Sequence, residues 1–161
     1  MTAGPARAEV PDNAITLEPL AVVFARTIAL EYERGFGPVG VALAAAVGLG
    51  DIAHKSTETT GDFNAFGVTL SVRVYPWDSA PRGAFFGPYA TMAWVEAKGD
   101  GDEGTASGLG WTVGAMAGYT WLLGRSFIVS AGAGVGWFEH DVGVGESGLL
   151  PALRLAVGAA F

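Results

Sequence analysis

The residue types that could do chemistry in this chain are few, and they cluster at the ends of apolar segments. Residues 98–104 read KGDGDEG and resemble part of a calcium-binding loop through Asp100, Asp102 and Glu103. The glutamate at the twelfth position, which completes the oxygen ligands of that motif, is missing. A solvated acidic loop is therefore the favoured interpretation of this segment.

A second candidate is the run of Glu139, His140 and Asp141, which could contribute metal ligands. A metal site would need a further histidine or carboxylate cluster, and the only other histidine is His54, in a different polar segment. The chain has no cysteine, which excludes disulfides, thiolate metal sites and a cysteine nucleophile. We therefore expect no metal site.

Ester hydrolysis would need a serine, a histidine and an acid in contact. Ser130 and His140 share a strand face, but the extended chain between them spans roughly 33 Å, which excludes the pair. His140 with Ser147 remains open. The glycines of GAGVG at 132–136 repeat every two residues, without the strand–turn–helix setting of a nucleotide-binding loop. We expect that the chain is not an enzyme and uses no cofactor.

Composition narrows the class of protein. Only 16% of the 161 residues are charged, 25 are glycine, and the net charge is −7. We expect no nucleic-acid partner, because phosphate binding needs a basic patch. No apolar run is long enough for a transmembrane helix. The candidate residues must therefore be held in place by a regular structure other than a transmembrane helix.

That structure is the β-strand, because hydrophobic residues recur with period two. In WTVGAMAGYTW at 111–121, Trp111, Val113 and Trp121 share one face, and small residues occupy the other. The same reading along the chain predicts strands near 14–23, 26–35, 38–50, 62–75, 84–97, 107–121, 125–140 and 149–161. Eight long strands without helices predict an all-β, antiparallel up-and-down barrel.

The connections alternate in length. They are short or proline-rich after the second, fourth and sixth strands, and longer and mostly polar after the third, fifth and seventh. Short turns at one end and long loops at the other are typical of outer-membrane barrels. We expect a barrel domain at 14–161 after an extension at 1–13. The extension lacks an apolar signal-peptide core, although Ala6-Arg7-Ala8 has the form of a cleavage site.

Aromatic residues stand where a barrel would meet the membrane interfaces. Ten residues of tilted strand climb roughly 25 Å, so Trp111 and Trp121 would lie at opposite interfaces. The predicted interface residues are Trp94, Trp111, Tyr119, Trp121, Phe127 and Trp137, and further aromatics near the short-turn end are Tyr75, Trp77, Phe85 and Phe161. The alternative is a soluble lipocalin-like barrel, which would hold a small apolar ligand inside. Its outer strand face would normally carry more charge than the small-residue face does here.

The terminal segment LRLAVGAAF and the stretch from Ile15 to Gly48 resemble small OmpA/OmpX-like barrels of uncharacterised function in Gram-negative bacteria. The likeness covers about residues 14–161. It implies an integral outer-membrane protein in contact with lipid, and recognition of Phe161 by the barrel-assembly machinery. Outer-membrane lipid-modifying hydrolases also use eight-stranded barrels, so that activity is a further alternative. A structural or surface-recognition role through the acidic long loops is the favoured function, with the surface partner unknown.

Charged residues also fall on the small-residue face, which would line the lumen. They are Glu18, Glu31, Glu33, Arg73 and Arg154. Buried charges persist when paired and hydrogen-bonded, so we expect a Glu/Arg network that plugs the barrel. A gated ion path through it is the alternative.

Two prolines conflict with this model. Pro19 and Pro88 fall within predicted strands, although proline cannot donate to a β-ladder and a closed barrel has no free edge. Bulges or misplaced strand ends would reconcile them.

Overall fold

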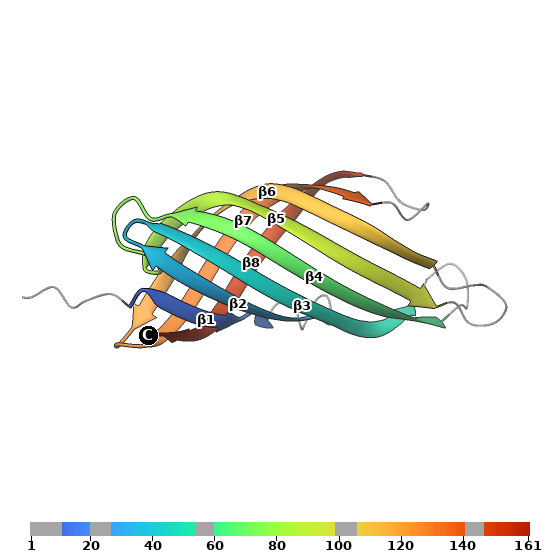
Figure 1. Ribbon diagram of the computed structural model, residues 1–161, viewed down its shortest axis with the longest axis horizontal. Coiled ribbons are helices and arrows are strands. Elements are labelled where there is room, and N and C mark those ends of the chain that lie inside the picture. The colour runs from blue at the N-terminus through green and yellow to red at the C-terminus, as the bar shows by residue number, and fades with distance from the viewer. Residues whose placement is uncertain (1–10, 20–26, 54–59, 99–105, 141–146) are drawn as a thin grey trace, which may run out of the picture.

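The chain folds into a closed, eight-stranded antiparallel barrel in which every strand pairs with its neighbours in sequence (Figure 1). The computed structural model describes residues 11–19, 27–53, 60–98, 106–140 and 147–161. The strands are β1 (Asn13–Leu17), β2 (Thr27–Phe36), β3 (Val39–Ala53), β4 (Thr60–Val74), β5 (Gly83–Lys98), β6 (Ala106–Leu123), β7 (Phe127–His140) and β8 (Gly148–Ala160). The predicted fold is confirmed. In the part of the chain that the structure describes, no helix is long and apolar enough to cross a membrane.

Side chains alternate between the two faces of the barrel wall as the sequence pattern predicts. Trp111 and Trp121 on β6 point outward and are 39% and 43% exposed, whereas Thr120 on the same strand faces the lumen and is 3% exposed. On β7 the outward Val135 contrasts in the same way with the buried Ile128. Successive residues of a strand face opposite sides of the sheet, so the alternation in sequence assigns each residue to the outer surface or to the lumen. The bulky face is the outer one, which contradicts the soluble alternative, where it would have to point inward.

Tight turns join the strands at one end of the barrel, which we call the turn end; the opposite end is the long-loop end. Gly37 and Pro38 connect Phe36 to Val39 in a two-residue hairpin, and Gly37 has a φ of 63° that suits glycine. Figure 1 places the turns and the C-terminus at the same end. The connections after β3, β5 and β7 lie outside the described residues.

The connection between β4 and β5 folds under the barrel and closes the turn end. The amides of Tyr75 and Ala80 donate hydrogen bonds to the carbonyls of Pro38 and Gly37, at 2.7 and 2.8 Å. Tyr75 and Ala80 are buried and pack with Phe85 in one apolar cluster. Tyr75 and Phe85, which were expected near the short-turn end, therefore lie at that end but inside the lumen rather than on the outer surface.

Pro19 lies beyond the strand in which it was predicted. β1 ends at Leu17, so the predicted strand at 14–23 extends too far, and residues 20–23 lie outside the described part of the chain. A proline lacks the N–H that a continued ladder would use. Of the two explanations offered for this proline, a misplaced strand end is the right one.

Pro88 does lie inside a strand, and the ladder is interrupted to accommodate it. β4 and β5 pair at Ser71↔Tyr89 and again at Val74↔Phe86, with no pairs between. The register is the same on both sides of the gap, so no extra residue is inserted and there is no bulge. The interruption lies where proline offers no backbone donor.

The seam between the first and last strands is short. β1 pairs with β8 at only four positions, from Ala14↔Ala160 to Leu17↔Val157. Beyond them the backbone groups of Asn13 and Phe161 exchange hydrogen bonds at 3.1 and 2.9 Å. The terminal residue is thus part of the closure of the barrel.

Candidate functional site

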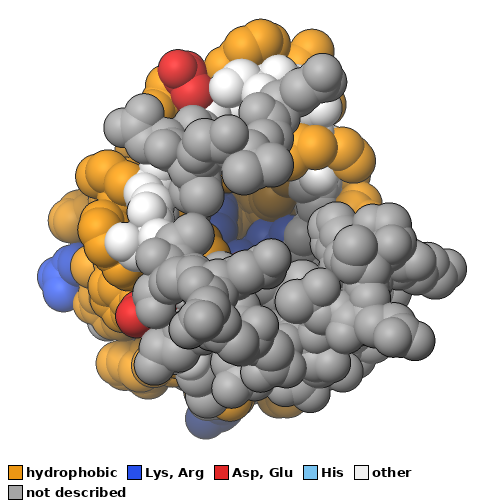
Figure 2. Space-filling view, turned by 90° about the vertical axis from the view of Figure 1, so that its right-hand side faces the viewer, with side chains coloured by type: hydrophobic (Ala, Val, Ile, Leu, Met, Phe, Trp, Pro, Cys, Tyr) orange, Lys and Arg blue, Asp and Glu red, His pale blue; other side chains and the backbone are white. Residues whose placement is uncertain are grey.

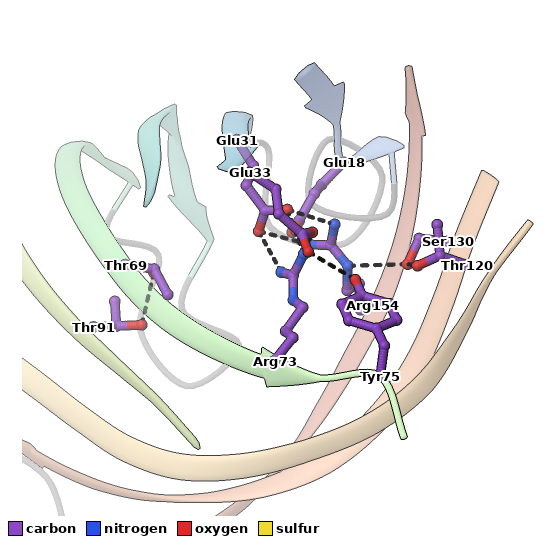
Figure 3. A network of polar contacts seen from close by, with 10 residues as sticks. All are labelled: Glu18, Glu31, Glu33, Thr69, Arg73, Tyr75, Thr91, Thr120, Ser130 and Arg154. Atoms are coloured by element: carbon purple, nitrogen blue, oxygen red, sulfur yellow. Dashed lines mark hydrogen bonds and ion pairs between the residues drawn. The ribbon is translucent and has the colours of Figure 1, made fainter. Parts of the chain in front are cut away.

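A layer of charged side chains crosses the lumen just above the closed turn end (Figure 3). Glu31 and Glu33 come from β2, and their alternation with outward Leu30, Tyr32 and Arg34 directs both inward. Arg73 and Arg154 come from β4 and β8, and Glu18 follows the end of β1. The members that the structure brings together are the same residues that the sequence pattern assigned to the lumen: Glu18, Glu31, Glu33, Arg73 and Arg154.

Arg73 holds both carboxylates of β2. Its Nη1 and Nη2 donate to Oε1 and Oε2 of Glu31 at 2.8 and 2.6 Å, which is the paired geometry of a planar guanidinium facing a carboxylate. Nη1 also donates to Glu33. The guanidinium carbon lies 5.4 Å from the ring centroid of Phe85, a cation–π distance. Arg73 therefore joins the charged layer to the apolar cluster below it.

Arg154 contacts the same glutamate from the other side of the lumen. Its Nη2 and Nη1 donate to Glu31 at 2.8 and 3.1 Å, and Nη1 also donates to Glu18. Its Nε lies 3.5 Å from the hydroxyl oxygen of Ser130. Glu31 is therefore shared by two guanidinium groups, and the carboxylates and guanidiniums form one connected network.

Three neutral residues complete the network and were missed by the sequence reasoning. The Tyr75 hydroxyl donates to Oε1 of Glu33 at 2.8 Å, and the hydroxyl oxygens of Thr120 and Ser130 lie 3.0 Å apart. Tyr75 follows Arg73 by two positions, so the same parity that placed Arg73 in the lumen could have placed Tyr75 there. The prediction from sequence instead grouped Tyr75 with the other aromatic residues near the short-turn end.

Four of the five charged residues in this layer are almost fully buried, and the Glu18 side chain is 25% exposed. Glu31 and Glu33 are each 4% exposed, and Arg73 and Arg154 are each 6% exposed. Removing a charge from water is costly unless ion pairs and hydrogen bonds replace the lost hydration. Here both guanidiniums contact two carboxylates each. The arrangement can therefore hold opposite walls of the barrel together, because Glu31 joins Arg73 on β4 to Arg154 on β8.

The predicted interface aromatics form two groups on the outer surface. Trp94, Trp111 and Trp137 lie toward the long-loop ends of β5, β6 and β7, and Tyr119, Trp121 and Phe127 lie toward the turn end. All six point outward and are between 39% and 52% exposed. The rings of Tyr119 and Trp121 are 4.9 Å apart. The wall between the groups carries apolar residues, as in a membrane-embedded barrel.

The other chemical candidates receive no support from the described residues. The acidic segment at 99–105, His54 and Asp141 lie outside them, and the side chain of His140 is likewise not described. In the part that is described, no three histidine, aspartate or glutamate side chains form a group that could hold a metal ion. Ser130 lies inside the lumen with its hydroxyl in contact with Thr120. Ser147 is exposed just before β8.

Comparison with known proteins agrees with the fold. A family described as "Protein of unknown function (DUF3575)" matches residues 22–143. The crystal structure of Ail, the attachment invasion locus protein of Yersinia pestis, in complex with the heparin analogue sucrose octasulfate, superimposes with a TM-score of 0.55 at 12% identity. The match covers 95% of this chain and 100% of the Ail chain. No curated protein matches the sequence.

Proposed function

We propose that this chain, which belongs to the DUF3575 family of proteins of unknown function, is a non-enzymatic integral protein of the bacterial outer membrane. The observation that carries the proposal is the outer surface of the closed barrel. Residues such as Leu43, Leu70 and Val113 are 55%, 52% and 48% exposed in the zone between the two aromatic groups. An apolar surface that surrounds a barrel in this way needs lipid around it.

We further propose that the lumen is closed to ions. Eight strands leave room for side chains but not for an open pore. The charged layer fills that room above the cluster of Tyr75, Ala80 and Phe85. An ion crossing the barrel would have to break buried ion pairs that have no water to replace them. This supports a plug rather than a gated path.

The proposed activity is recognition at the long-loop end. The sequence of the long connections contains Asp100, Asp102, Glu103, Asp141 and Glu146, all of which lie outside the described residues. Ail was crystallised with a polyanion, the heparin analogue sucrose octasulfate. The acidic connections of the present chain would repel such a ligand and favour a cationic partner. Positive surfaces on proteins are the partner class that we propose.

The location is tested by expressing the chain behind a working signal peptide and running outer-membrane and soluble fractions on a gel with and without boiling. We expect the protein in the outer-membrane fraction, with a band that shifts on heating because the closed barrel resists detergent. A soluble protein without a shift would refute the membrane proposal.

The plug is tested separately, by reconstituting the protein in planar bilayers. We expect no stable conductance from the wild-type barrel. Regular open-channel steps would show that the lumen conducts and would refute the plug, while leaving the membrane location intact.

A further inference from the structure

A cavity of about 270 Å³ lies in the lumen on the long-loop side of the charged layer. Its lower boundary is formed by Glu31, Arg73 and Arg154, and its walls come from β2 to β6 and β8. Figure 2, which views the barrel from the long-loop end, shows blue Lys/Arg side chains at the bottom of a hollow. The plug and the cavity are therefore stacked along the barrel axis.

One wall of this cavity carries hydroxyl groups. Thr69 and Ser71 on β4 face Thr91 and Tyr89 on β5, in directly opposed pairs. The hydroxyl oxygens of Thr69 and Thr91 lie 2.8 Å apart and form a hydrogen bond, which is drawn as a dashed line in Figure 3. The Ser71 hydroxyl is buried and has no hydrogen-bond partner among the described residues. Ser71 is 8% exposed, so it has no ready access to bulk water. A buried hydroxyl without a partner in the protein is unfavourable unless a molecule in the cavity, either water or a guest, supplies one.

The remaining walls are mainly apolar and are shaped to keep the space open. Ala44 and Ala46 on β3 and Met116 on β6 line the cavity. A Cβ atom on Gly114 would come within 2.7 Å of the Tyr89 ring, so the glycine lets that ring lie against the wall of β6. The cavity thus combines a hydrogen-bonding wall with apolar surroundings.

The charges at the cavity's lower boundary argue against a charged ligand. Two carboxylates, Glu18 and Glu31, and two guanidiniums, Arg73 and Arg154, line the cavity and are already paired with one another. A further ion would have to lose its hydration without gaining a free partner. An uncharged molecule meets no such cost.

We propose that this cavity binds a small uncharged amphiphile, with one hydroxyl head hydrogen-bonded to Ser71 and a compact apolar body beside Ala46 and Met116. An apolar cavity of about 150 Å³ is known to accept benzene, so a space of about 270 Å³ accommodates an aromatic alcohol. The site is distinct from the long loops and does not depend on the proposed surface recognition.

The test uses the full chain in detergent, labelled with ¹³C at its methionine methyl groups, and benzyl alcohol as the probe. Met116 lines the cavity, whereas Met92 on β5 points outward and is 58% exposed. We expect the Met116 signal to shift and saturate as benzyl alcohol is added. The Met92 signal should shift only in proportion to the alcohol dissolved in the micelle. The chain has three methionines, so the variants Met92→Leu and Met116→Leu assign these two signals and leave the third to Met1.

Two matched substitutions on β3 show whether the saturable shift of the Met116 signal comes from binding in the cavity. Ala46→Leu fills the cavity and should abolish the saturable shift, whereas Ala45→Leu, on the outward face of the same strand, should preserve it. Ser71→Ala should weaken binding by roughly fivefold to tenfold, as expected for loss of one hydrogen bond. The heat-shifted band verifies that each variant is folded.

A Met116 response that follows Met92 without saturating would overturn the proposal, as would a saturable response that survives in folded Ala46→Leu. If Ala46→Leu does not fold, Ser71→Ala decides the question, because unchanged affinity in that variant would also overturn it. Failure of the long loops to recognise a partner would leave these measurements unaffected.

Discussion

Arg154 on β8 donates two hydrogen bonds to Glu31 on β2, at 2.8 and 3.1 Å, although these strands are not neighbours in the barrel. β1, the five-residue strand between them, separates the two. The Arg154–Glu31 pair therefore connects β8 to β2 across β1, the shortest described strand. The four backbone pairs of the seam between β1 and β8 are thus supplemented by a charged contact inside the lumen.

Replacement of Arg73 by methionine should strongly destabilise the barrel. Arg73→Met leaves Glu31 and Glu33 buried with one guanidinium fewer, and breaking a buried pair in this way costs about 3–5 kcal/mol. The measurement is the temperature at which the compact band on an unboiled gel converts to the unfolded band. Arg125→Met, in the exposed turn after β6, is the control and should leave that temperature nearly unchanged.

A second substitution shows whether the stranded charge is the cause. Glu33→Gln in the Arg73→Met background removes one uncompensated carboxylate and should recover part of the lost stability. Unchanged melting of Arg73→Met itself would refute a stabilising network.

Loss of the buried Tyr75 hydroxyl should lower the free energy of unfolding more than loss of an exposed hydroxyl. Tyr75→Phe removes a buried hydrogen bond to the Glu33 carboxylate and should cost about 1.5–3 kcal/mol. Tyr32→Phe removes the bond between an outward hydroxyl and Asn13 and should cost less than about 1 kcal/mol. Urea denaturation of the two variants in the same detergent gives the comparison. Equal effects would mean that burial of the Glu33 contact contributes nothing.

The free-energy cost of an arginine on the outer face should depend on how deeply its position lies in the surrounding lipid. Ala133 lies between Phe127 and Trp137 on the outward face of β7, so Ala133→Arg should cost about 2–4 kcal/mol in a bilayer. Glu139→Arg, on the same strand and face beyond Trp137, should cost no more than about 1 kcal/mol. Folding into liposomes against urea measures both. A neutral or stabilising effect of Ala133→Arg would indicate that this face meets water.

Replacement of Phe161 should reduce assembly in cells while leaving the stability of the folded barrel nearly unchanged. Phe161→Ala keeps the backbone hydrogen bonds between Phe161 and Asn13, and the side chain that it removes is 61% exposed. Purified, refolded protein should therefore melt within a few degrees of wild type. In cells, the amount of heat-shifted protein in the outer membrane should fall severalfold if the barrel-assembly machinery reads this residue. Equal amounts in cells would refute that role.

The sequence by itself determined where eight strands lie along the chain and which face each strand residue takes, although the end of the first strand was placed too late. The separation of Trp111 from Thr120 and of Leu30 from Glu31 follows from the two-residue period of a strand, and this period can be read from one segment at a time. The same period puts Glu31, Glu33, Arg73 and Arg154 on the interior face of their strands, whereas Glu18 lies beyond the end of β1. Short turns at one end followed from the turn residues in the sequence, such as Gly37 before Pro38.

Only the tertiary structure decided which interior groups meet. Parity fixes the face of Glu31, but its contact with both Arg73 and Arg154 depends on the stagger and curvature with which eight strands close, and no single strand encodes these. The inward fold of the β4–β5 connection, which buries Tyr75, depends on contacts with a distant turn. That the Ser71 hydroxyl finds no partner within the described part of the chain likewise depends on what the opposite walls present to it. Local alternation is a property of the chain, whereas contacts across a lumen are a property of the closed barrel.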